Sequence, residues 1–173
     1  MKLSKLMKLS ALSTFTLMGG GGGGGCCSVP SDVKPHSELA AEEAAMNLVR
    51  DVARGGYDLI STEAIKKKLD AGEDMVIIDT MPKDSYDKNH IPGALGAVLP
   101  GTMEDVDPQR RGAFVKALGD DKDKPVVIYC GRVSCYRSHV GALIAKEEGF
   151  THVLRHPGGI DAWLEAGYEA ESK

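Results

Sequence analysis

The residues best suited to chemistry gather in one short stretch, between Cys130 and Arg137. This stretch follows an apolar run, Val126–Tyr129, and contains a second cysteine and two arginines. A cysteine thiolate is a strong nucleophile, and an arginine guanidinium can bind a tetrahedral oxyanion through two N–H groups. The combination predicts cysteine chemistry on an anionic substrate, with Cys130 as the nucleophile.

The positions after Cys130 are suited to activating its thiol. A thiol is mostly protonated at neutral pH, so a nucleophilic cysteine needs neighbours that lower its pKa. Backbone N–H groups of a tight loop, the N-terminus of a helix that begins near Arg137 and the two guanidinium groups all favour a negative charge there. The same groups would hold the substrate against the sulfur. The predicted anion-binding loop consists of Gly131, Arg132, Val133, Ser134, Cys135, Tyr136 and Arg137.

Two alternatives stay open for these cysteines. Free cysteines are often ordinary core residues, although a core position for Cys130 would not account for the arginines, glycine and serine that follow it. Cys135 is a resolving thiol, an auxiliary sulfur carrier or a bystander. A disulfide with Cys130 requires the loop to bring the two Cα atoms to about 5–6 Å.

The elements that must position this stretch alternate between helix and strand from Tyr57 onward. Short apolar runs bounded by turn residues predict strands at Met75–Ile78, Ala97–Leu99, Val126–Tyr129 and His152–Arg155. Helical patterns lie at Ser61–Leu69, Gln109–Leu118, Arg137–Glu148 and Ile160–Glu165, with one helical turn within Pro82–His90. This alternation indicates an α/β domain with a mainly parallel sheet, in which sites lie at the carboxyl ends of strands. Cys130 stands at such an end.

An extra N-terminal helix is predicted over Ser37–Arg54, with Ser37 as its cap and Gly55-Gly56 as its end. We expect it to pack on the domain that follows. The apolar residues predicted on one face are Ala41, Ala45, Leu48, Val49 and Val52.

The first 27 residues are typical of an export signal. Three lysines precede a short apolar stretch, Leu9–Met18, which is too short to span a bilayer. Seven glycines then lead to Cys26, as small residues lead to the lipidated cysteine of bacterial lipoprotein signals, although Gly23 stands where that pattern usually has leucine. We expect export to the periplasm with Cys26 as the lipidation site, which would be the protein's only link to a membrane; a plain secretory signal is the alternative. Residues 28–56 are then a linker and the N-terminal helix, and residues 57–170 form the folded domain.

Composition narrows the choice of partners. The chain has 173 residues and a net charge of −4, and an acidic protein is a poor ligand for nucleic acid. No Cys/His spacing matches a metal site, and the Gly19–Gly25 run precedes no strand–helix unit that could bind a nucleotide. The sequence predicts no cofactor.

Three segments together resemble the signatures of rhodanese-like domains. The cysteine loop resembles their active-site loop. The other two segments are Val76–Asp79 with Tyr86 and His90–Ala94, and Gly158–Trp163 with Ala166–Tyr168. The resemblance covers about Tyr57 to Glu169 and implies a three-layer α/β fold, in which a central, mainly parallel sheet is flanked by helices.

The resemblance also implies sulfur transfer. In this family the cysteine takes sulfane sulfur from a donor such as thiosulfate, forms a persulfide, and passes the sulfur to cyanide, a thiol or a small acceptor protein. Carried onto this chain, Cys130 is the persulfide carrier, Gly131–Tyr136 form the anion cradle, and Arg137 closes it.

Two departures from the family pattern bear on these expectations. Met81 stands where the family commonly has an arginine, which puts a structural salt bridge to Asp79 in question. Arg137 follows Cys130 by seven positions instead of five. Because related phosphatases and arsenate reductases also have longer loops, an oxyanion reductase or phosphatase is one alternative function. A non-enzymatic sulfur or redox sensor that uses Cys130 and Cys135 as a reversible pair is the other.

Overall fold

The computed structural model describes residues 37–173. The predicted export signal, Cys26 and the linker lie outside the described residues. Within residues 37–173, no helix is both long enough and apolar enough to cross a bilayer.

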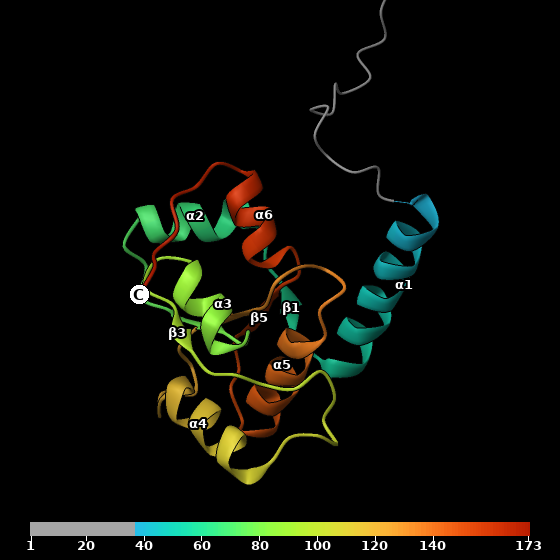
Figure 1. The fold of residues 1–173 in the computed structure, drawn as a ribbon. Coiled ribbons are helices and arrows are strands. Elements are labelled where there is room, and N and C mark those ends of the chain that lie inside the picture. The colour runs from blue at the N-terminus through green and yellow to red at the C-terminus, as the bar shows by residue number, and fades with distance from the viewer. Residues whose placement is uncertain (1–36) are drawn as a thin grey trace, which may run out of the picture. The chain divides into compact units, whose positions relative to one another are not determined.

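A five-stranded, wholly parallel sheet forms the centre of the domain (Figure 1). The strands are β1 (Asp58–Leu59), β2 (Val76–Asp79), β3 (Leu95–Gly96), β4 (Val126–Tyr129) and β5 (Val153–His156), in the order β1-β5-β4-β2-β3. The helices are α1 (Glu38–Gly55), α2 (Thr62–Asp70), α3 (Lys83–Lys88), α4 (Pro108–Leu118), α5 (Arg137–Glu147) and α6 (Gly159–Glu165). The predicted fold class, including the extra N-terminal helix, is confirmed.

The apolar run of β4 explains why helices cover both faces of the sheet. Successive strand side chains point to opposite faces. Val126 and Ile128 pack with side chains of α4 and α5, whereas Val127 and Tyr129 pack with side chains of α2 and α6. A strand buried on both faces needs apolar residues at every position, and this places β4, with the cysteine at its end, in the middle of the molecule.

Most of the predicted elements are present within one or two residues, but the edges of the sheet differ. The edge strand β1 was not predicted, because both of its two residues are exposed and leave no apolar pattern. The strand predicted at Ala97–Leu99 is wrong: β3 lies two residues earlier, where Leu95 pairs with Ile78. Ala97 and Leu99 are buried beyond the strand's end, so their apolar character marks core packing.

Helix α1 has the predicted length but a different contact face. It packs beside α5 (Figure 1) and ends at Gly56, which has a φ of 61°. Its N-cap residue, Ser37, makes no side-chain hydrogen bond to the helix. Leu48 and Val52 are half-buried as predicted, but Ala41, Ala45 and Val49 are exposed. The helix is turned so that the polar Asp51 also faces the domain.

The missing arginine at position 81 leaves Asp79 buried without an ion pair. Asp79 is 0% exposed; its Oδ1 accepts a hydrogen bond from the Met81 amide at 2.7 Å, and its Oδ2 has no partner within the described part of the chain. Burial raises the pKa of Asp79 from 3.8 to about 6. The Asp79 carboxyl group therefore holds its proton more tightly in the folded state than in the unfolded state. As a result, the stability of the fold falls as the pH rises from about 4 to above 6.

We expect Asp79→Asn to raise the free energy of unfolding at about pH 7.5 by about 1 kcal/mol. In the wild type, a pKa shift of about two units destabilises the folded state by about 3 kcal/mol. In the variant, the buried amide without a full set of hydrogen bonds costs about 1–2 kcal/mol instead. Urea unfolding across the pH range measures the effect, and the gain should vanish near pH 4. The exposed Asp58→Asn serves as control; an equal gain in both variants at every pH would contradict this account.

Candidate functional site

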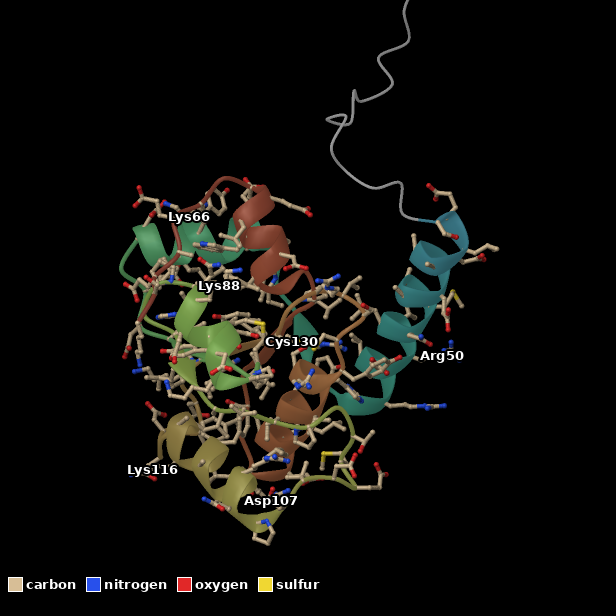
Figure 2. The ribbon with its side chains drawn as sticks, viewed as in Figure 1. Arg50, Lys66, Lys88, Asp107, Lys116 and Cys130 are labelled. Carbon is tan, nitrogen blue, oxygen red and sulfur yellow. The ribbon has the colours of Figure 1, made fainter. Side chains whose placement is uncertain are left out.

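Cys130 lies at the carboxyl end of β4, in the interior of the domain (Figure 2). It is 1% exposed. Its Sγ lies 3.1 Å from the carbonyl oxygen of Cys135 and 3.3 Å from Oγ of Ser138. The hydrogen bond with the Cys135 side chain and the burial of the thiol raise the pKa of Cys130 well above its ordinary range. In this arrangement Cys130 is a protonated thiol, which shares its one proton between the carbonyl oxygen and the sulfur of Cys135.

Cys135 has the opposite surroundings. It is half-buried and lines a cavity of about 530 Å³ beside the cysteine loop. The Nη1 atom of Arg137 lies 3.8 Å from its Sγ. The hydrogen bond from Cys130 lowers the pKa of Cys135, and the backbone N–H groups of Arg137 and Gly131 lower it further. The sequence predicted that these N–H groups and the guanidinium would surround Cys130. In the structure they are directed at the sulfur of Cys135 instead.

The two arginines of the loop are in different states. Arg132 is exposed and forms an ion pair with Asp161, with 3.1 Å between Nε and Oδ2. Arg137 forms no ion pair among residues 37–173, and its buried Nε has no hydrogen-bond partner there. Both line the 530 Å³ cavity, but only Arg137 keeps its charge free for an anion.

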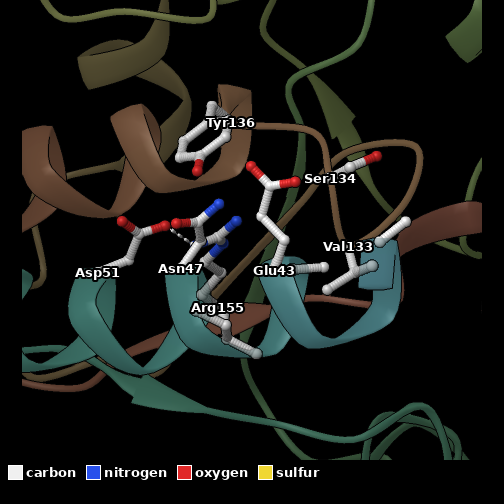
Figure 3. Close-up of a pocket in the computed structure, with 10 residues that line it drawn as sticks. Glu43, Asn47, Asp51, Val133, Ser134, Tyr136 and Arg155 are labelled. Atoms are coloured by element: carbon white, nitrogen blue, oxygen red, sulfur yellow. Dashed lines mark hydrogen bonds and ion pairs between the residues drawn. The ribbon is translucent and has the colours of Figure 1, made fainter. Parts of the chain in front are cut away.

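The outer residues of the loop face helix α1. Val133, Ser134 and Tyr136 line a second cavity of about 250 Å³, together with α1 residues that include Glu43 and Asn47 (Figure 3). Ser134 and Tyr136 also line the cavity that holds Cys135. All seven predicted loop residues and Cys130 are therefore gathered at the carboxyl end of the sheet. The Cys130 thiol is buried beneath the loop, whereas the Cys135 thiol lines the cavity.

The loop backbone is held by the start of α6. The amides of Ile160 and Asp161 donate to the carbonyl oxygens of Cys130 and Gly131, each at 3.0 Å. Gly159 makes this approach possible, because a Cβ atom there would lie 2.3 Å from the Cys130 oxygen. The sequence marked this Gly-Gly turn only as part of a signature, since its contact with the loop spans some thirty residues of chain.

A buried arginine supports the loop from behind, and sequence reasoning missed it. Arg155, which is 2% exposed, binds Asp51 of α1 at 3.1 Å, Ser138 Oγ at 3.1 Å and the Cys135 carbonyl at 3.4 Å. The pair of Asp51 and Arg155 is seen in Figure 3. The signal available in the sequence was a lone charge inside a predicted apolar strand.

His139 belongs to the same support and not to the cavity. Its Nδ1 lies 2.7 Å from the hydroxyl of Tyr57, and its Nε2 lies 4.0 Å from Asp51. His139 is therefore a packed residue of α5.

Comparison with known proteins agrees with the fold. Residues 61–166 match the family model of the rhodanese-like domain. The chain is 33% identical over 101 residues to the thiosulfate sulfurtransferase GlpE of Coxiella burnetii, covering 58% of this chain and 78% of that protein. It is 31% identical over 104 residues to YrkF of Bacillus subtilis, a proposed sulfur carrier, covering 60% of this chain but only 49% of YrkF, so it spans about half of that relative.

Comparison with a solved structure also supports the fold. The crystal structure of a thiosulfate sulfurtransferase from Pseudomonas aeruginosa superposes with a TM-score of 0.57 at 25% identity, covering 75% of this chain and 22% of that one. The matched residues 61–166 contain β2 to β5, the cysteine loop and the start of α6 that holds it. Because the family model matches residues 61–166, which are more than half of the chain, the chain belongs to the rhodanese-like domain family.

Proposed function

We propose that this protein is an exported sulfurtransferase, which takes sulfane sulfur from thiosulfate or a persulfide and passes it to a thiol or cyanide through a persulfide on Cys130. The observation that carries the proposal is the unpaired Arg137, which lines a cavity together with the Cys135 thiol, on the loop that follows Cys130 at the carboxyl end of β4. The names of GlpE and of the Pseudomonas aeruginosa enzyme support thiosulfate as the donor class.

The chemistry requires an anion held with its sulfane sulfur against a thiolate. Thiosulfate carries two negative charges, and a guanidinium can bind its oxygens through two N–H groups. The thiolate attacks the outer sulfur, the S–S bond of thiosulfate breaks, and the electron pair leaves with sulfite. The protein keeps one sulfur as a persulfide, which an acceptor thiol or cyanide then removes.

Export is supported by the N-terminal sequence alone. The three lysines, the apolar stretch Leu9–Met18 and Cys26 after seven glycines are the features that carry it. Labelling of cells with a radioactive fatty acid tests the lipid: we expect label on the wild-type chain and none on Cys26→Ser.

The turnover of thiosulfate and cyanide to sulfite and thiocyanate tests the proposed activity. We expect Cys130→Ser to abolish multiple turnover, with Cys27→Ser as the matched control that retains it. A Cys130→Ser protein with full turnover would disprove the role of Cys130. Hydrolysis of an aryl phosphate or reduction of arsenate by a wild-type protein that does not consume thiosulfate would favour the oxyanion alternative.

Arg137 should determine affinity for the donor. A charge-assisted hydrogen bond contributes about 1.5–3 kcal/mol, so we expect Arg137→Gln to raise the KM for thiosulfate roughly ten- to a hundredfold. The control is Arg110→Gln, because Arg110 is an exposed residue of α4 whose one ion pair within residues 37–173 is with Asp107. Equal KM values for the two variants would show that Arg137 does not bind the donor.

A further inference from the structure

We infer that the loop contains a two-cysteine relay, in which Cys135 takes the sulfur from the donor anion and hands it to Cys130. This inference rests on the proposed function and adds a second catalytic residue to it. It assigns an entry thiol at the cavity and a storage thiol beneath it.

Access to the cavity is the first argument. Cys130 is 1% exposed and is not among the residues that line the 530 Å³ cavity. Cys135 lines that cavity together with Arg137. An anion held by Arg137 therefore meets the sulfur of Cys135 before it can meet that of Cys130.

The charge around each sulfur is the second argument. Two carbonyl oxygens, which repel a thiolate, lie near Cys130 Sγ: that of Cys135 at 3.1 Å and that of Arg132 at 3.9 Å. Cys135 Sγ faces the Arg137 guanidinium at 3.8 Å and two backbone N–H groups, which favour one. The hydrogen bond between the two cysteine side chains and the burial of Cys130 act in the same direction: they raise the pKa of Cys130, and the hydrogen bond lowers the pKa of Cys135. The thiolate is the reactive form of a cysteine.

The adjacency of the two thiols makes the second step possible. Cys130 Sγ lies 3.1 Å from the carbonyl oxygen of Cys135, and Ser138 Oγ lies 3.3 Å from Cys130 Sγ. That hydroxyl accepts a hydrogen bond from Arg155 at 3.1 Å, so its own proton is free to stabilise a developing thiolate on Cys130.

Both steps balance without an added oxidant or reductant. In the first, the Cys135 thiolate attacks the outer sulfur of thiosulfate and sulfite leaves with the electron pair, which gives a persulfide anion on Cys135. In the second, the Cys130 thiol gives its proton to this persulfide, and the resulting Cys130 thiolate attacks the outer sulfur. The S–S bond to Cys135 breaks, so that Cys130 carries the persulfide and Cys135 is again a thiolate.

The sequence permits a direct test, because trypsin separates the two cysteines. Cleavage after Arg132 places Cys130 on peptide 123–132 and Cys135 on peptide 133–137, while Cys26 and Cys27 lie on a third peptide. The full-length chain is mixed with one equivalent of thiosulfate, quenched at intervals by alkylation, digested and mapped by mass spectrometry.

The relay predicts a different label on each protein. In the wild type the extra sulfur is found on peptide 123–132. In Cys130→Ser it stays on peptide 133–137 and forms at close to the wild-type rate. In Cys135→Ser it reaches Cys130 at least tenfold more slowly. Iodoacetamide at mildly acidic pH should also alkylate Cys135 well before Cys130 in the untreated wild type.

Two outcomes would overturn the relay while leaving the proposed function intact. In the first, sulfur reaches Cys130 of the Cys135→Ser protein at the wild-type rate. In the second, the Cys130→Ser protein takes up no sulfur although its cooperative thermal unfolding shows that it is folded. Cys135→Ala provides a second variant in case the serine disturbs the loop. Absence of added sulfur from both peptides of the wild type would instead refute the proposed function itself.

Discussion

Gly159→Ala should cost most of the activity and several kcal/mol of stability. Gly159 has a φ of 62°, and a Cβ atom there would lie 2.3 Å from the Cys130 oxygen and 2.5 Å from the Gly131 oxygen. The left-handed conformation costs an alanine about 1–2 kcal/mol, and forced overpacking adds about 1–3 kcal/mol. The obstructing atoms are backbone atoms of the cysteine loop, so relief of the clash must move the loop away from the start of α6.

A second glycine separates the two causes. Gly167 also has a positive φ, of 74°, but nothing lies within 4 Å of its Cβ position. We expect Gly167→Ala to lose only the stability that a left-handed backbone conformation costs an alanine, and to keep full sulfur transfer. Urea unfolding and thiosulfate turnover measure both effects, and equal losses of activity in the two variants would show that the contact between Gly159 and the loop is unimportant.

Asp51→Asn should destabilise the domain, because it removes the carboxylate that is paired with the buried Arg155. Arg155 is 2% exposed, and Asp51 is the only carboxylate paired with it within residues 37–173. Removal of one partner from a buried ion pair costs about 3–5 kcal/mol. Because Asp51 is partly accessible and the Tyr57 hydroxyl, 3.2 Å away, still binds Arg155, we expect a loss near the lower end of that range.

The same substitution should weaken sulfur transfer. Arg155 also binds Ser138 Oγ and the Cys135 carbonyl, so a shift of its side chain alters the contacts of both thiols. Glu43→Gln is the control, since Glu43 lies on the same helix and forms no ion pair within the part of the chain that the structure describes. An Asp51→Asn protein as stable as Glu43→Gln would contradict the role of α1 as a support of the loop.

The sequence predicted the central strand of the sheet more accurately than the edge strands. The run Val126–Tyr129 is apolar at every position because both of its faces are buried, so strand β4 could be located residue by residue. The strand β1 has two exposed residues and is defined only by its hydrogen bonds to β5. Such pairing is a property of the assembled sheet, and no local pattern reports it.

The candidate site shows a similar division. Residue types and spacing predicted an anion-binding loop after Cys130, but in the structure the unpaired Arg137 lies beside the sulfur of Cys135. They could not predict which cysteine faces the cavity, because side chains in an irregular loop follow no period. The hydrogen bond from Cys130 to the Cys135 carbonyl and the support from Arg155 depend on contacts formed only in the folded chain.

The intact mass of the wild-type protein after treatment with thiosulfate tests the central claim most directly. The excess reagent is removed, the mass is measured without reduction, and the released sulfite is quantified. Sulfur transfer through the cysteine loop predicts a gain of one sulfur atom per chain with one equivalent of sulfite, reversed by cyanide. An unchanged mass, or a loss of two hydrogens from a disulfide between Cys130 and Cys135 without bound sulfur, would contradict it.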